Sequence, residues 1–204
     1  MKQIKWKSMV ITCGICLLSI LLGVALWERL PDTMAIHFNI HNEPDNFAPK
    51  GVVVFGLPVL MALMQALCCF VTDLNSIRYG ASQKLERVAK GIIPVVSILL
   101  HMATLGYALG WDIDIRRVAG LIVGVMFLAM GNYLPKLDYI KHYKLDTEKA
   151  RKINRFVGFE MVIMGLLFLV SLLLPPAATV ICLCLLIPCT LLGVGCAIKV
   201  VREK

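Results

Sequence analysis

A polar segment near the N-terminus, PDTMAIHFNIHNEPDNFAPK, holds side chains that can do chemistry. His37 and His41 are four residues apart, and Glu43 and Asp45 follow closely. Imidazole and carboxylate groups are metal ligands, so the segment is a candidate metal site. In a strand, however, residues four apart are separated by about 13 Å, and Pro44 argues against a helix. The pattern therefore favours hydrogen bonds from His37 and Asn39 to the turn backbone, with Asp45 capping or pairing with Lys50. We expect no metal or cofactor.

The same segment has the pattern of a short hairpin. Residues 35–40 alternate between apolar and polar types, and residues 41–46 are rich in turn formers. Asn42 and Asn46 both suit a positive φ angle. Because unpaired backbone polar groups cannot lie in lipid, we expect an ordered cap that rests on the mouth of a helix bundle.

Two ionisable residues, Glu160 and His101, fall inside long apolar stretches. An ionisable side chain within a membrane span is a candidate functional residue. For both residues the sequence nevertheless favours a structural role over a functional one. Glu160 can pair with Lys136, Arg155 or the amide of Asn132, and His101 can be hydrogen-bonded inside a bundle.

The composition predicts an integral membrane protein. The 204 residues are 59% hydrophobic with a mean hydropathy of +0.80, whereas soluble domains are about 45–50% apolar. The excess gathers into runs of about 20 residues, the length that a helix needs to cross a bilayer. We expect an all-α, six-helix transmembrane bundle that forms a single domain over residues 1–204. The expected spans are residues 8–27, 51–72, 91–110, 118–134, 156–174 and 178–198. Their glycines, at Gly14, Gly23, Gly120, Gly124, Gly165, Gly193 and Gly195, are expected at close helix contacts.

The distribution of basic residues predicts the orientation. Of the 21 Lys and Arg residues, all but four fall at the termini or in the second-to-third and fourth-to-fifth connections. The four exceptions are Arg29, Lys50, Arg116 and Arg117. The positive-inside rule then puts both termini and a basic loop at residues 136–155 in the cytoplasm, and the cap at residues 28–50 outside. Helix formers around Lys84 and an N-cap signal at Asp146 extend the third and fifth helices into the cytoplasm.

Several functional classes are disfavoured. The net charge of +8 is confined to particular connections, which argues against nucleic-acid binding. All eight cysteines lie in apolar runs, where thiolates are poorly stabilised, so they are interpreted as packing residues. Nucleophile-elbow, zinc-protease and P-loop motifs are absent, and we expect no enzymatic activity.

Two short motifs stand out, one in the cap and one at the end of the fourth span. The first comprises His37, Phe38, Asn39, Glu43, Pro44, Asp45 and Lys50, and the second comprises Gly131, Asn132, Tyr133, Leu134, Pro135 and Lys136. Both motifs resemble those of the bacterial SdpI family. With the helices between them, they cover about residues 30–174. The resemblance implies a multi-pass protein of the bacterial plasma membrane that gives immunity to a secreted toxic peptide. It also implies, in some members, signalling through a cytoplasmic repressor held at the membrane.

The chain departs from the family pattern at two places. The family usually has glycine where Asn42 and Asn46 stand, and asparagine is the mildest replacement for a left-handed glycine. The chain also lacks the tryptophans and histidine that many members carry after the second motif. This departure argues against the repressor binding that the resemblance implies. A small transporter or membrane enzyme that uses Glu160, His101 and Asn132 in one polar cavity remains the alternative, as does a signalling module that acts through the basic loop.

Overall fold

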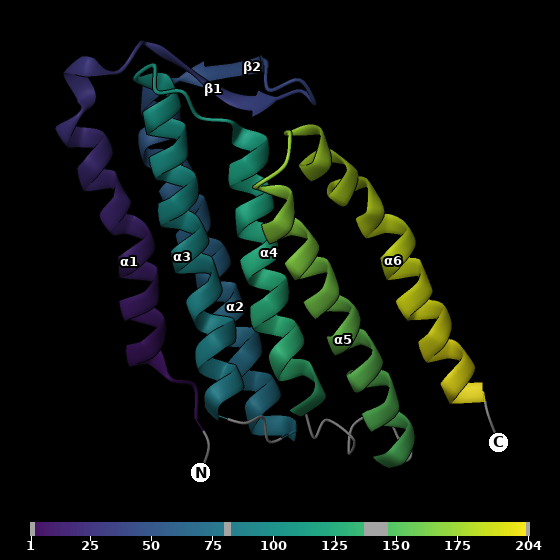
Figure 1. The fold of residues 1–204 in the computed structure, drawn as a ribbon. Helices are drawn as coiled ribbons and strands as arrows, with labels where there is room; N and C mark the ends of the chain where they lie inside the picture. Colours follow the sequence, from purple (N-terminus) through teal and green to yellow (C-terminus); the bar gives the residue numbers. More distant parts are fainter. Residues whose placement is uncertain (1–2, 80–82, 137–146, 203–204) are drawn as a thin grey trace. The chain divides into compact units, whose positions relative to one another are not determined.

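The computed structural model describes residues 3–79, 83–136 and 147–202, which form six long helices and one small sheet (Figure 1). The helices are α1 (Trp6–Ala25), α2 (Leu57–Tyr79), α3 (Gln83–Ala108), α4 (Ile115–Tyr133), α5 (Thr147–Ser171) and α6 (Ala177–Arg202). Each is long and apolar enough to cross a bilayer, judged by length and composition. The expected all-α membrane fold with six spans is therefore confirmed.

The helix ends differ from the limits of the apolar runs. α3 begins at Gln83 and α5 at Thr147, each well before the start that hydropathy indicates. Helix propensity and capping decide where a helix begins, whereas hydropathy decides which part of it lies in lipid. One consequence is that Pro94 lies inside α3 and not in its first turn. Asp146, the expected N-cap of the fifth helix, lies outside the described residues.

The second long helix opens with a wide turn. Residues Val52–Gly56 form a π-helix that leads directly into α2. Pro58 follows, and its missing N–H leaves the carbonyl of Val54 without the usual helical donor while its ring crowds that carbonyl. A π-turn widens the backbone at this point and so relieves the crowding.

The predicted hairpin is confirmed. β1 (Thr33–Phe38) and β2 (Pro44–Pro49) pair in antiparallel fashion, with irregular register around His37. Asn42 has a φ of 65° at the turn, as its residue type indicates. The same expectation for Asn46 is wrong, because Asn46 lies within β2 opposite His37 and lacks a positive φ.

The chain divides into two compact units. The first comprises Met1–Leu74 and Ala89–Val118, and the second comprises Asn75–Val88 and Ala119–Lys204. In the first unit, the hairpin lies across the ends of α1, α2 and α3, at the end opposite the N-terminus (Figure 1). Met34 of β1 is 1% exposed and packs there against Val54 and Leu105. Burial of these side chains holds the cap on the helices.

In the second unit, glycines let the helices approach closely. A Cβ atom on Gly165 of α5 would lie 2.9 Å from the carbonyl oxygen of Gly124 in α4. A Cβ atom on Gly120 or Gly193 of the second unit, or on Gly23 of the first unit, would also lie within 3 Å of a neighbouring side chain. The expectation of close contacts is wrong for Gly14 and Gly195, where a Cβ atom would have no neighbour within 4 Å. Many large apolar side chains point outward instead of into a core, among them Leu63 and Leu173, as lipid-facing residues do.

Candidate functional site

The cap presents an exposed hydrogen-bonded pair between its two strands. Nδ1 of His37 lies 2.5 Å from Oδ1 of Asp45, and both side chains are exposed. Asp45 therefore pairs with His37 across the hairpin and not with Lys50. The pair places an imidazole and a carboxylate side by side on the exposed surface of the cap.

Asn39 closes the turn that joins the strands. Its Oδ1 accepts hydrogen bonds from the backbone N–H groups of His41 and Glu43, at 2.9 and 3.0 Å. Its Nδ2 donates to Oε2 of Glu43 at 2.9 Å. A short polar side chain is suited to this role, because it satisfies backbone donors that the turn leaves unpaired.

Lys50 anchors the base of the hairpin. Its Nζ lies 3.2 Å from Oδ1 of Asp32 and 5.0 Å from the ring centroid of Trp27. The backbone N–H of Lys50 also donates to the carbonyl of Asp32 at 2.8 Å. The Lys50 side chain is 21% exposed, so it acts mainly as an internal brace, by ion pairing and a cation–π contact.

The tip of the cap is fastened to the first residues of α4. Oδ1 of Asn42 accepts the N–H of Ile115 at 2.9 Å, and Nη1 of Arg116 donates to the carbonyl of Ile40 at 3.0 Å. The sequence reasoning gave Arg116 no role. The signal for it was the run WDIDIRR, in which acids and bases of one short loop follow each other closely.

Arg116 is held in place by Asp114. Nη2 and Nε of Arg116 donate to the two carboxylate oxygens of Asp114, at 2.8 and 2.9 Å. These hydrogen bonds hold the pKa of Asp114 below its usual range. Phe38 adds an apolar link, because its ring packs edge-on against Tyr107 of α3 at 4.7 Å between centroids. Pro44 stands opposite Phe38 in the hairpin.

The described residues contain no group of three or more His, Cys, Asp or Glu side chains placed to hold a metal ion. In the cap, the ring of His37 is engaged with Asp45. The described side chains of the cap are held by hydrogen bonds and ion pairs, with one exposed face and a braced base.

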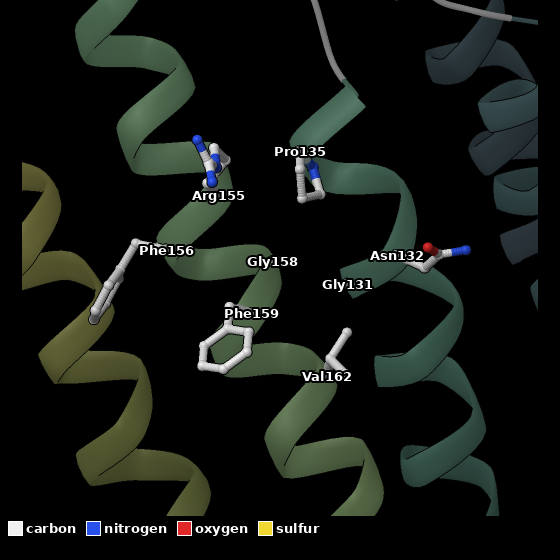
Figure 2. Close-up of a pocket in the computed structure, with 8 residues that line it drawn as sticks. All are labelled: Gly131, Asn132, Pro135, Arg155, Phe156, Gly158, Phe159 and Val162. Carbon is white, nitrogen blue, oxygen red and sulfur yellow. The ribbon is translucent and has the colours of Figure 1, made fainter.

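The second motif lies where α4 ends against α5 (Figure 2). A Cβ on Gly131 would lie 2.7 Å from the carbonyl oxygen of Gly158, and a Cβ on Gly158 would lie 2.7 Å from Cδ of Pro135. Asn132 is exposed and points away from α5. Tyr133 is half-buried, and the side chain of Lys136 lies outside the described residues. In this motif Gly131 and Pro135 make the helix contact.

The ionisable residues of the spans lie in different surroundings. His101 is 0% exposed, and neither ring nitrogen has a hydrogen-bond partner within the described residues. Glu160 lines an apolar pocket of about 420 Å³ between α5 and α6. It has no hydrogen-bond or ion-pair partner in the described ranges, so the expected pairing with Arg155 or Asn132 is not formed. Asn132 and Glu160 line different pockets.

Sequence reasoning missed a buried ion pair between α2 and α3. Nζ of Lys90 lies 2.6 Å from Oδ1 of Asp73, with side chains 5% and 1% exposed. The backbone N–H of Lys5 donates to the other oxygen of Asp73 at 2.9 Å. Helix formers around Lys84 predict that the third helix extends through Lys90, and this is confirmed because α3 begins at Gln83. The burial of Lys90 against Asp73 was not predicted.

A buried amide completes this site. Pro94 has no N–H, so the carbonyl of Lys90 four residues earlier loses its helical donor. Nε2 of Gln65 in α2 donates to that carbonyl at 2.8 Å, and Gln65 is fully buried. Two features of the sequence could have indicated this site. Pro94 leaves a backbone carbonyl of its own helix without a donor, and Gln65 and Asp73 lie two turns apart on one face of an apolar run.

Comparison with known proteins supports the resemblance to the SdpI family. The model of a family described as "Domain of unknown function (DUF1648)" matches residues 14–62, from α1 to the first part of α2. The chain is 26% identical over 172 residues to "Immunity protein SdpI" of Bacillus subtilis (strain 168), which covers 80% of this chain and 81% of the relative. No solved structure matches the chain. These similarities support an SdpI-family assignment and a multi-pass membrane protein.

Proposed function

We propose, from the SdpI-family assignment, that this protein is an immunity protein of the bacterial plasma membrane that gives resistance to a secreted, membrane-active toxic peptide. The observation that carries the proposal is the similarity to Immunity protein SdpI over four-fifths of both chains. The protein acts by binding the peptide or by blocking its access to the bilayer, and no enzymatic step is involved. Both termini lie in the cytoplasm, as the distribution of basic residues indicates.

The cap is the proposed site of first contact. It exposes the acids Glu43 and Asp45 beside the apolar side chains of Ile36, Ile40 and Phe47, which are 51%, 65% and 55% exposed. A membrane-active peptide presents apolar surface, and exposed apolar side chains with a polar rim suit its recognition. The bracing contacts at the base hold this surface in one conformation, which lowers the entropy lost on binding.

Signalling to a cytoplasmic repressor is a further part of the proposal. The segment that would bind it is the basic loop at residues 136–155, of which residues 137–146 lie outside the described residues. Exposed bases on the described part, such as Arg151 and Arg155, suit an acidic partner. A pull-down of cytoplasmic proteins on the full-length protein, compared with a variant in which these arginines are glutamine, tests it.

A small transporter is the second candidate function. It is favoured by polar atoms of the first unit that have no hydrogen-bond partner within the described residues, namely Oε1 of Gln65 and the two ring nitrogens of His101, both fully buried residues. Buried polar groups without partners are costly and are often kept for function. Under this proposal, His101→Phe abolishes transport in proteoliposomes, whereas an immunity protein of the proposed kind keeps its protection with the same substitution.

Survival of a sensitive bacterium tests the leading proposal. The protein is expressed in a Bacillus subtilis strain that lacks its own SdpI, and killing curves are recorded with the toxic peptide. We expect protection by the natural chain, reduced protection by Asp45→Asn and Lys50→Gln, and full protection by Glu148→Gln, an exposed acid outside the cap. Membrane fractions confirm equal amounts of each variant.

Two outcomes count against the proposal. No protection by the natural chain, with the protein present in the membrane, excludes immunity to that peptide. Equal protection by Asp45→Asn, Lys50→Gln and the natural chain excludes the cap as the contact site and leaves immunity itself standing.

A further inference from the structure

An open pocket of about 560 Å³ lies beside the contact between α4 and α5, within the second unit (Figure 2). Gly131 and Pro135 form one wall, at the end of α4 and in the following 3-10 turn. Arg155, Phe159 and Val162 line the pocket from α5. The volume falls in the range of about 300–1,000 Å³ that small-molecule sites occupy.

Among the described residues, the pocket is lined by one basic side chain, Arg155, and by no acidic side chain. Arg155 is exposed, and its guanidinium has no hydrogen-bond or ion-pair partner in the ranges that the structure describes. The remaining lining is apolar, glycine or proline apart from Asn132. A guanidinium without a partner fits a phosphate group, because its planar fork can donate two parallel hydrogen bonds.

The pocket stands at the boundary between charged and apolar sequence. The first turns of α5 carry Lys149, Arg151, Lys152 and Arg155, and from Phe156 onward the helix is apolar apart from Glu160 and the terminal Ser171. Figure 2 shows Arg155 at the level of Pro135, with Phe159 and Val162 further along α5. A charged group on Arg155 would therefore lie at headgroup depth, while the rest of the pocket reaches into the hydrocarbon.

Two aromatic rings extend the apolar part of the surface. Phe156 is 44% exposed and Phe159 is 67% exposed. Large exposed rings next to a single cation match a ligand that has an anionic head and a long apolar chain. A soluble anion such as inorganic phosphate has no apolar part that could contact these rings.

We propose that this pocket binds one anionic phospholipid, with its phosphate on Arg155 and an acyl chain along Phe159 and Val162. The lipid lies over the place where Gly131 and Gly158 bring the two helices together, and it stabilises that contact. This site is separate from the cap, which is the proposed site of contact with the toxic peptide. Basic pockets between transmembrane helices are a known setting for anionic headgroups.

Lipid binding to the purified full-length protein tests the inference. The protein in neutral detergent is titrated with phosphatidylglycerol, and bound lipid is counted by native mass spectrometry. We expect Arg155→Gln to weaken binding about fivefold, since one basic contact near the membrane surface contributes about that factor. Arg151→Gln is the matched control, because Arg151 lies one turn away on the same helix, is exposed and does not line the pocket.

Two ligands and one further variant complete the experiment. Phosphatidylcholine and inorganic phosphate are expected to bind much more weakly than phosphatidylglycerol, since one lacks net charge and the other lacks acyl chains. Phe159→Ser, which keeps Arg155, is expected to weaken phosphatidylglycerol and to leave phosphate unchanged. Equal binding by Arg155→Gln and Arg151→Gln overturns the proposal, as does equal affinity for phosphatidylglycerol and phosphatidylcholine. Binding of phosphate as strong as that of the lipid would identify a soluble-anion site instead.

Discussion

Oδ1 of Asp73 and Nζ of Lys90 lie 2.6 Å apart, and both side chains are almost fully buried between α2 and α3. A buried ion pair is weak support for stability as a whole, because desolvation opposes the attraction between the charges. Removing one partner is a different matter, because it leaves the other charge buried and unpaired. The pair therefore fixes how the two helices are rotated against each other.

The first prediction concerns this pair. We expect Lys90→Met to lower the free energy of unfolding by about 3–5 kcal/mol, because Asp73 is left as an uncompensated buried charge. Asp73→Asn combined with Lys90→Met is expected to recover most of the loss, since the asparagine can still accept from the N–H of Lys5. Unfolding in detergent, followed by circular dichroism, measures both.

The control for this prediction is the exposed pair of Glu148 and Lys152, which lie 3.0 Å apart with side chains 73% and 60% exposed. Lys152→Met is expected to change stability by less than about 1 kcal/mol. A single substitution at Lys90 as mild as the one at Lys152 would contradict the structural role of the buried pair.

A second prediction follows from the contact between Gln65 and the backbone at Lys90. Gln65→Leu removes the donor to a carbonyl that Pro94 leaves unpaired, and we expect a loss of about 1–3 kcal/mol. In a Pro94→Ala background the helix supplies its own N–H to that carbonyl, so Gln65→Leu should be less harmful. A double-mutant cycle on thermal unfolding measures the coupling. Equal losses in both backgrounds would show that Gln65 does not substitute for the missing helical donor.

A third prediction concerns the packing of α4 on α5. Gly131→Ala and Gly158→Ala are each expected to lower the free energy of unfolding by about 1–3 kcal/mol, because the added methyl group meets backbone or proline atoms. Gly195→Ala, in open space on α6, should be neutral or slightly stabilising, since alanine is the better helix former. Melting temperatures of the three variants, measured side by side, separate packing from helix propensity. A destabilised Gly195→Ala would argue that glycine is needed for another reason.

The fourth prediction is a pH dependence at the cap. The hydrogen bonds from Arg116 lower the pKa of Asp114 below its ordinary value of 3.8, so the carboxylate stabilises the fold where it is charged. This contribution is fully present above the unfolded pKa and is lost as the pH falls through the lower folded pKa. We expect Asp114→Asn to cost about 1 kcal/mol at pH 6 and progressively less as the pH is lowered toward 2.

The control for this measurement is Asp112→Asn. Asp112 is exposed in the same loop and has no hydrogen-bond partner in the described part of the chain. Its substitution should have little effect on unfolding at either pH. If Asp114→Asn and Asp112→Asn give the same pH profile, the contact with Arg116 does not stabilise the cap.

The sequence alone determined the features that depend on local chemistry. Long apolar runs predict spanning helices, because a bilayer requires about 20 apolar residues with all backbone groups paired. Alternation and turn residues predict the hairpin, and the residue type of Asn42 predicts its positive φ. The two SdpI-like motifs could also be read from the sequence, since each is short and continuous.

The tertiary structure alone decided which distant side chains meet. The pairing of Asp73 with Lys90, the use of Gln65 on the Lys90 carbonyl and the fastening of Asn42 to Ile115 each join different elements. Such contacts depend on the rotation and depth of each helix, which the packing of the whole unit sets. The pocket at Arg155 likewise exists because Gly131 and Gly158 let two helices meet at one particular height.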